Sequence, residues 1–144
     1  MTHMDLAEGY VHSTGGSYIA GSFSFTDNWA HSWGVAIARK VKVGRQTVLL
    51  INSMKYSVST SAHRGSIRRA AQAAGLRMFE VPNLHIDHDH EANLRFYLAR
   101  ITDLKARRVS ALKPAKYDQL IQELQQEMSD YIDLFEPEQQ KEAA

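Results

Sequence analysis

The stretch that decides the fold runs from Tyr56 to Leu76 and reads Y-S-V-S-T-S-A-H-R-G-S-I-R-R-A-A-Q-A-A-G-L. It begins with alternating polar and β-prone residues and then becomes helical, with apolar side chains at helical spacing. A hydroxyl of Thr60 or Ser61 can accept the unpaired N–H groups of a first helical turn, so we expect a helix over residues 61–74. Gly75 is placed to end that helix in a left-handed conformation.

The same helix carries side chains that suggest an anion-binding site. His63, Arg64, Arg68 and Arg69 follow the hydroxyl-rich helix N-terminus, where backbone N–H groups and the helix dipole attract anions. The alternative is an ordinary, well-capped surface helix. For His63 itself, the alternative to a ligand contact is a buried, hydrogen-bonded histidine that fixes the loop before its helix.

Around this helix the sequence predicts an α+β domain with the element order β-β-β-α-β-α-α and a small, mostly antiparallel sheet. The last two helices, whose apolar stripes recur at offsets of three and four, are separated at Lys113-Pro114 and are expected to form an αα-hairpin. Period-two or continuous apolar patterns predict four strands, at residues 17–25, 33–43, 47–54 and 78–81. Apolar stripes at helical spacing predict the two later helices, at residues 90–108 and 115–135.

The expected domain organisation follows from these elements. Residues 17–136 form one α+β domain, made of a sheet part (17–84) and a helical hairpin (88–135). Residues 1–16 carry little pattern and are expected to be a flexible leader, and residues 137–144 a disordered tail.

Composition narrows the class of protein. The chain has 144 residues and 44% hydrophobic residues, enough for a core of its own. It has no run of about 18 apolar residues, which argues against a membrane span. It has no cysteine, which excludes disulfides and thiolate chemistry. Its first residues lack the basic-then-apolar pattern of a signal peptide, so we expect a cytoplasmic protein.

Charge is distributed unevenly along the chain. Residues 28–79 hold nine Lys and Arg and no acid, whereas residues 117–144 hold eight acids and one Lys. Either the basic segment forms a binding face, or the two segments neutralise each other.

Nucleic-acid binding is the reading that this charge favours. Lys40 and Lys42 share one strand face, and Arg45 lies in the next loop. Arg64 and Arg68 are one helical turn apart. Together these side chains could line a surface that follows the phosphates of a nucleic-acid backbone. Four aromatic residues could stack on bases if they are exposed: Tyr18, Trp29, Trp33 and Tyr56. Alternatively, Trp33 and Tyr56 anchor the core. No helix-turn-helix, zinc-finger or RNA-recognition signature is present.

The most conspicuous chemical string is H-I-D-H-D-H, residues 85–90. Its imidazoles and carboxylates could hold a divalent metal, with further ligands from His12, His31 or His63. The alternative is the acidic start of a helix, with Asp87 or Asp89 as its N-cap. The candidate metal ligands are His85, Asp87, His88, Asp89 and His90. The chain lacks the sequence patterns of serine–histidine catalysis, of a P-loop and of a dinucleotide-binding fingerprint.

One family resemblance comes from the central stretch. The string Y-S-V-S-T-S-A-H-R at residues 56–64, followed by Ile67, Arg68, Arg69 and Ala70, resembles a motif in a family of small uncharacterised bacteriophage proteins. That pattern runs roughly Tyr-Ser-x-Thr-Thr-Ser-x-His between a hairpin and a helix, and Ser59 stands where the family usually has Thr. The resemblance covers residues 47–76 and implies phage origin and no mechanism. Small phage accessory proteins often bind a host macromolecule, which favours a binder acting in the host cytoplasm.

Three functional hypotheses follow. The first is a non-enzymatic protein that binds nucleic acid or an acidic host protein through a basic surface around residues 39–69. The second is a metal-dependent enzyme at residues 85–90, and the third an assembly protein that forms a homodimer through helix 115–135. The binding residues of the first hypothesis are Lys40, Lys42, Arg45, Thr60, Ser61, His63, Arg64, Arg68 and Arg69.

Overall fold

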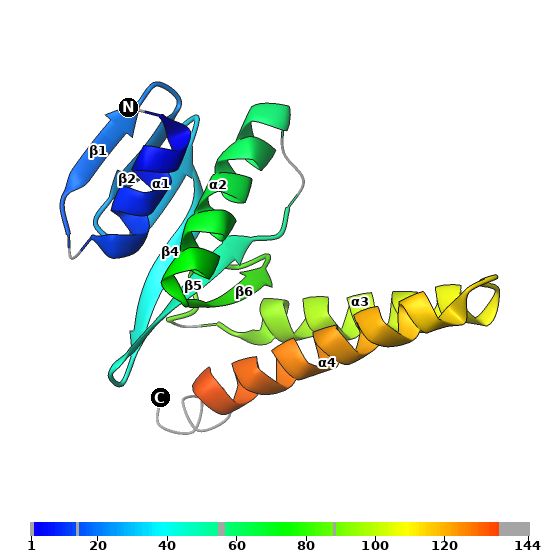
Figure 1. The fold of residues 1–144 in the computed structure, drawn as a ribbon. Helices are drawn as coiled ribbons and strands as arrows, with labels where there is room; N and C mark the ends of the chain where they lie inside the picture. The colour runs from blue at the N-terminus through cyan, green and yellow to red at the C-terminus, as the bar shows by residue number, and fades with distance from the viewer. Residues whose placement is uncertain (1, 14, 55–56, 88, 136–144) are drawn as a thin grey trace. The chain divides into compact units, whose positions relative to one another are not determined.

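A computed structural model describes residues 2–13, 15–54, 57–87 and 89–135. The described chain is α+β, as expected, and forms two compact units, Met1–Leu84 and His85–Ala144. The first unit holds a six-stranded sheet with two helices, and the second is a pair of helices (Figure 1).

The sheet of the first unit has its strands in sequential order, β1 to β6. The first five strands pair antiparallel, whereas β6 pairs parallel to β5. The sheet is therefore mixed, because α2 carries the chain back between β5 and β6. The strands are β1 (Ser17–Ala20), β2 (Phe23–Thr26), β3 (Trp29–Ser32), β4 (Val35–Val43), β5 (Gln46–Asn52) and β6 (Arg77–Val81).

Two turns explain why there are six strands where the sequence predicted four. The expected strand 17–25 is two strands, since Gly21 takes φ 63° and turns the chain between β1 and β2. The segment after Thr26 forms β3, which was not predicted. A second turn at Trp33 and Gly34, with φ of 52° and 78°, then separates β3 from β4.

The prediction of a flexible leader at residues 1–16 is wrong, because most of this segment is helix α1 (His3–His12). Thr2 and Asp5 form a reciprocal capping box: the Asp5 N–H donates to the Thr2 hydroxyl, and the Thr2 N–H donates to the Asp5 carboxylate. Leu6 and Tyr10 are then buried on one side of the helix. That short pattern was missed because ten residues offer few helical turns to recognise.

Helix α2 (Val58–Ala74) begins three residues earlier than predicted. Its N-cap is Ser57, whose hydroxyl accepts from the Thr60 N–H at 3.3 Å, rather than Thr60 or Ser61. Its end agrees with the prediction: Gly75 is left-handed (φ 73°), and its N–H donates to the carbonyls of Ala71 and Gln72.

Two glycine substitutions in this helix should have opposite effects. Gly75→Ala should lower the free energy of unfolding by about 1 kcal/mol, because a Cβ is strained at positive φ. Gly65→Ala should raise it by about 0.5–1 kcal/mol, because Gly65 is inside the helix and its added Cβ meets only the Arg69 guanidinium, at 3.6 Å. Urea titration of both variants checks this, and equal effects of the same sign would contradict it.

Helices α1 and α2 pack on one face of the sheet and form the main core with it (Figure 1). Strand residues that point to this face alternate with residues that point away from both helices. The buried sheet residues in this core are Phe23, Phe25, Ala30, Ile37, Ala38, Leu49 and Ile51.

The second unit is the predicted αα-hairpin, α3 (Glu91–Val109) and α4 (Pro114–Phe135). Ile101, Leu104 and Ile121 form a buried cluster between the two helices, with Tyr117, Leu124 and Met128 partly buried against them. The tail predicted at 137–144 lies outside the described residues. No helix within the described part of the chain is long and apolar enough to span a membrane.

Candidate functional site

The hydroxyl groups at the start of α2 are bonded to one another and to the sheet. The Ser57 hydroxyl lies 3.2 Å from those of Ser59 and Thr60, and Thr60 lies 2.9 Å from the Ser32 hydroxyl in β3. Thr60 is buried, whereas Ser61 is exposed. Of the two hydroxyls expected to bind an anion, that of Thr60 therefore serves the connection between α2 and β3.

His63 continues this network into the core. Its side chain is fully buried, with Nδ1 2.7 Å from the Ser32 hydroxyl and its ring stacked on Phe23 at 4.5 Å. The His3 ring stands edge-on to it, also at 4.5 Å, and Nε2 has no hydrogen-bond partner among the described residues. Burial, and then the nearby His3, lower the pKa of His63 below its ordinary value. His63 is therefore a buried, hydrogen-bonded histidine, which was the alternative to a residue that contacts a ligand.

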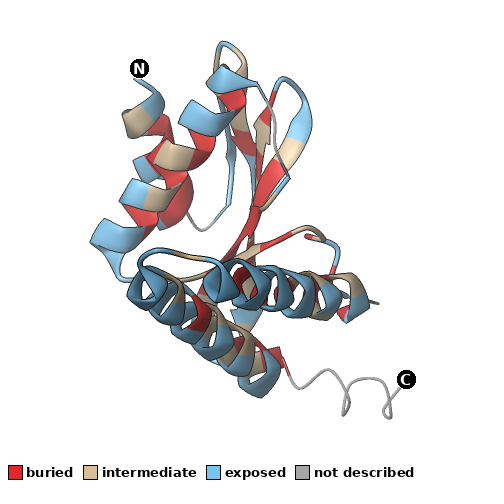
Figure 2. Ribbon diagram, turned by 90° about the vertical axis from the view of Figure 1, so that its right-hand side faces the viewer, coloured by how far each residue is buried: buried red, intermediate tan, exposed pale blue. Residues whose placement is uncertain are grey.

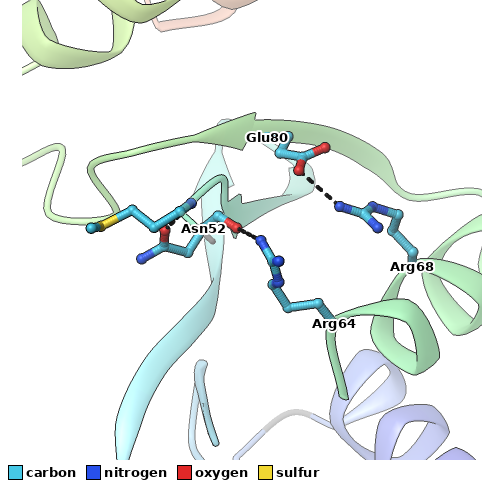
Figure 3. Close-up of polar contacts among 5 residues, drawn as sticks. Asn52, Arg64, Arg68 and Glu80 are labelled. Atoms are coloured by element: carbon cyan, nitrogen blue, oxygen red, sulfur yellow. Dashed lines mark hydrogen bonds and ion pairs between the residues drawn. The ribbon is translucent and has the colours of Figure 1, made fainter. Parts of the chain in front are cut away.

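Arg64 and Arg68 are both engaged within the first unit (Figure 3). Arg64 is 9% exposed, and its guanidinium donates to the Asn52 carbonyl at 2.6 Å, at the end of β5. The Arg68 guanidinium forms an ion pair with Glu80 of β6 at 2.9 Å, with both side chains partly exposed. Figure 3 shows the two arginines reaching from α2 toward the sheet. The buried Arg64 is therefore not part of an exposed basic surface.

Lys40 is likewise not part of the expected basic surface. It is 4% exposed, and its ammonium donates to the Tyr10 carbonyl at 2.6 Å and to the carbonyl and hydroxyl of Ser13 at 2.9 and 2.8 Å. It thus closes the C-terminal end of α1, where the helix dipole favours a cation. Burial lowers the pKa of Lys40.

The remaining predicted cations are exposed but are not gathered in one place. Lys42 lies near the end of β4, Arg45 in the β4–β5 turn and Arg69 on α2. The β4–β5 turn is separated from the Arg64–Asn52 contact by the length of β5, about 20 Å at 3.4 Å per residue. The predicted binding residues therefore do not form one continuous surface.

The candidate metal ligands of residues 85–90 have varied surroundings. His85, Asp87 and Asp89 are exposed, and Asp89 accepts from the Glu91 N–H at 2.8 Å at the start of α3. His90 is buried, with Nδ1 2.6 Å from the Tyr131 hydroxyl. Within the described ranges no three His, Cys, Asp or Glu side chains come together as a metal site, and His88 lies outside those ranges.

The strand register brings together a set of residues on the sheet face opposite α1 and α2. One row across the strands pairs Thr26 with Trp29 and Trp29 with Arg39, and the next pairs Ser24 with His31. We call Ile19, Ser24, Trp29, His31 and Arg39 the sheet platform. Ile19 is 77% exposed, and the other four are partly buried.

Arg39 and Trp29 form the centre of the platform. The Arg39 guanidinium lies over the Trp29 ring, 5.0 Å from its centroid, and donates to the Leu84 carbonyl at 3.1 Å. This contact holds the cation over the face of the aromatic ring. Trp29 was already a stacking candidate in the sequence, but its pairing with Arg39 depends on the unpredicted strand β3. The alternation of Trp29 and His31 with Ala30 and Ser32 was the signal for that strand.

The other candidate aromatic residues lie elsewhere. Trp33 is 68% exposed in the β3–β4 turn, where its indole N–H donates to the Ser59 hydroxyl at 3.0 Å. Trp33 therefore does not anchor the core. Tyr18 is 55% exposed and lies beside Phe25 on the helix-covered face. Tyr56 is outside the described residues.

Comparison with known proteins adds no assignment, since no protein-family model, curated protein or solved structure matches the chain.

Proposed function

We propose that this protein is a non-enzymatic binder of single-stranded nucleic acid and that the sheet platform is its contact surface. The observation that carries the proposal is the Arg39 guanidinium over the Trp29 ring, on the sheet face opposite α1 and α2. A base can stack on the planar guanidinium or on the aromatic ring of such a pair, and the same cation attracts phosphate. Stacking of this kind needs no sequence signature, which agrees with the lack of a recognition motif.

The polar side chains around Trp29 support the same use. Ser24 and His31 lie opposite each other on β2 and β3, and Thr26 lies opposite Trp29. Their hydroxyl and imidazole groups can donate to phosphate or base oxygens. Neighbouring strands are about 4.8 Å apart, so these groups surround the Trp29 ring within the reach of one or two nucleotides.

Net charge favours an anionic partner for the first unit. Residues 1–84 contain nine Lys and Arg against four Asp and Glu, a formal net charge of +5. Lys40 and Arg64 belong to this total but are buried, and Lys42 points to the same sheet face as Lys40. Arg39 and Arg45 are therefore better placed to meet phosphates beside the platform. The basic surface proposed around residues 39–69 is thereby narrowed to the sheet platform and the β4–β5 turn.

The proposed function agrees with the resemblance of residues 47–76 to small bacteriophage proteins. The phage origin that this resemblance implies stays a prediction. A phage-type accessory protein of this kind would act in the cytoplasm of the host cell. An acidic host protein is the competing partner, and a binding test with nucleic acid distinguishes these two kinds of partner.

The test is fluorescence anisotropy of the full chain with a labelled single-stranded DNA or RNA of about 15 nucleotides, compared with a duplex of equal length. Trp29→Leu should weaken single-strand binding about 10-fold or more, because one stacked base is worth about 1–3 kcal/mol. Arg39→Gln should also weaken binding and lower the slope of log affinity against log salt by about 1.

Trp33→Leu is the matched control, because Trp33 is exposed but lies in the β3–β4 turn outside the platform. It should bind like the unmodified chain. Equal affinity of Trp29→Leu and the unmodified chain would contradict the platform. No single-strand binding even at about 50 mM salt would overturn the nucleic-acid proposal and leave an acidic host protein as the partner to seek.

A further inference from the structure

The α3–α4 hairpin leaves part of its apolar surface uncovered. Leu98 of α3 is 55% exposed and Ile132 of α4 is 40% exposed, and most of both helices is drawn as exposed in Figure 2. Even the buried residues between the two helices, Ile101, Leu104 and Ile121, keep 7–8% of their surface exposed. Two helices can enclose an apolar seam only in part, because each residue of the seam meets neighbours from one side.

The uncovered residues lie on one side of the hairpin. The contacts Asn93–Tyr131 and Arg108–Asp118 fix the antiparallel alignment of the two helices. At 3.6 residues per turn, Leu98 then projects to the same side of the hairpin as Ile132. We call this side, which also includes the partly buried Leu94 and Met128, the hairpin face.

The two helices carry opposite charge. Residues 91–109 of α3 contain five Lys and Arg against two acids, a net charge of +3. Residues 114–135 of α4 contain five acids against Lys116, a net charge of −4. A second hairpin placed with its α4 on the first α3 therefore brings unlike charges together twice, whereas α3 on α3 and α4 on α4 would bring like charges together.

We propose that two copies of this chain associate through the hairpin face and form an antiparallel four-helix bundle with α3 of each copy on α4 of the other. A two-fold axis parallel to the helices generates this arrangement, and all neighbouring helices are then antiparallel. Leu94 and Leu98 of one copy meet Met128 and Ile132 of the other. The residues of the hairpin face and those of the sheet platform belong to different units.

The size of the face sets the expected strength. Helices of about 20 residues are about 30 Å long, and two side by side are about 20 Å wide, so each copy would bury on the order of 600 Å². The total of about 1,200 Å² is at the lower end of the range for specific interfaces. Dimerisation is therefore expected to depend on concentration in the micromolar range.

Sedimentation equilibrium of the full chain, at about 1–200 μM, tests the proposal. The mass should rise from 16.3 kDa toward twice that value. Leu98→Glu and Ile132→Glu should each give monomers at all concentrations, since each puts a charge into the hairpin face. Leu112→Glu is the control, because Leu112 is fully exposed between the two helices, and it should still dimerise. Circular dichroism should show all three variants folded.

Because the chain has no cysteine, introduced thiols can identify the arrangement. Leu98 and the exposed Gln125 project from the hairpin face at nearly the same level. A mixture of Leu98→Cys and Gln125→Cys chains should form a disulfide-linked pair on oxidation, whereas either variant alone should form much less. A monomeric unmodified chain at about 200 μM, or dimers that persist in both glutamate variants, would overturn the proposal. Crosslinking of Leu98→Cys alone as efficient as that of the mixture would overturn the α3-on-α4 arrangement.

Discussion

Lys40→Met should lower the free energy of unfolding by about 3 kcal/mol, whereas Lys42→Met should change it by less than about 0.5 kcal/mol. The two lysines lie two residues apart on β4, so their side chains point to the same sheet face. Only Lys40 is buried, and only its ammonium closes the C-terminal end of α1.

The size of the Lys40 effect follows from the groups that would lose their donor. Three oxygen atoms of Tyr10 and Ser13 accept from the Lys40 ammonium, and hydrogen bonds to a charged group contribute about 1.5–3 kcal/mol. Methionine keeps most of the aliphatic stem and removes the charge, so the loss reports on these bonds rather than on packing. The cation also lies 4.9 Å from the centroid of the Tyr10 ring, which adds to its attraction.

Urea unfolding of the two variants, followed by circular dichroism, measures the difference. A matched loss in Lys40→Met and Lys42→Met would contradict the buried position of Lys40.

The second large effect is acid destabilisation caused by His63. Burial lowers the pKa of His63 in the folded state below its ordinary value of 6.5, and the unfolded chain has the ordinary value. Below pH 6.5 the unfolded chain therefore binds a proton that the folded chain does not. Stability attributable to His63 should be fully present above pH 6.5 and fall as the pH decreases, by up to about 1.4 kcal/mol per pH unit until the folded-state pKa is reached.

The variant His63→Asn should reduce this pH dependence. The asparagine amide can reach the position of Nδ1 and keep the hydrogen bond to the Ser32 hydroxyl, but it does not titrate. The variant should be less stable at pH 7.5, because the ring stacked on Phe23 is lost, yet its stability should fall less steeply with acid. His12→Gln, at an exposed position in α1, should keep the slope of the unmodified chain. Equal slopes for His63→Asn and the unmodified chain would refute the assignment.

The sequence determined those elements whose residue patterns are local. The long helices at 91–109 and 114–135 follow from apolar stripes at helical spacing, over about three turns in the first helix and about five in the second. The end of α2 follows from Gly75. The α+β class and strand β5 follow in the same way, since a continuous apolar run such as V-L-L-I needs no information from elsewhere in the chain. The ten-residue helix α1 and the four-residue strands β1 to β3 were missed or merged, because so few residues give a weak periodic signal.

The candidate site depended on contacts between residues distant in sequence, so only the tertiary structure decided it. Lys40 and Lys42 are alike in sequence, but the C-terminal end of α1 lies over the first and not the second. Arg64 fits an exposed helical face by its spacing, but the Asn52 carbonyl at the end of β5 accepts from it and it is buried. Trp29 and Arg39 are ten residues apart and become neighbours through the register of β3 on β4. Composition established the charge of the chain, whereas burial and strand pairing, which depend on the whole fold, decided which charges can meet a partner.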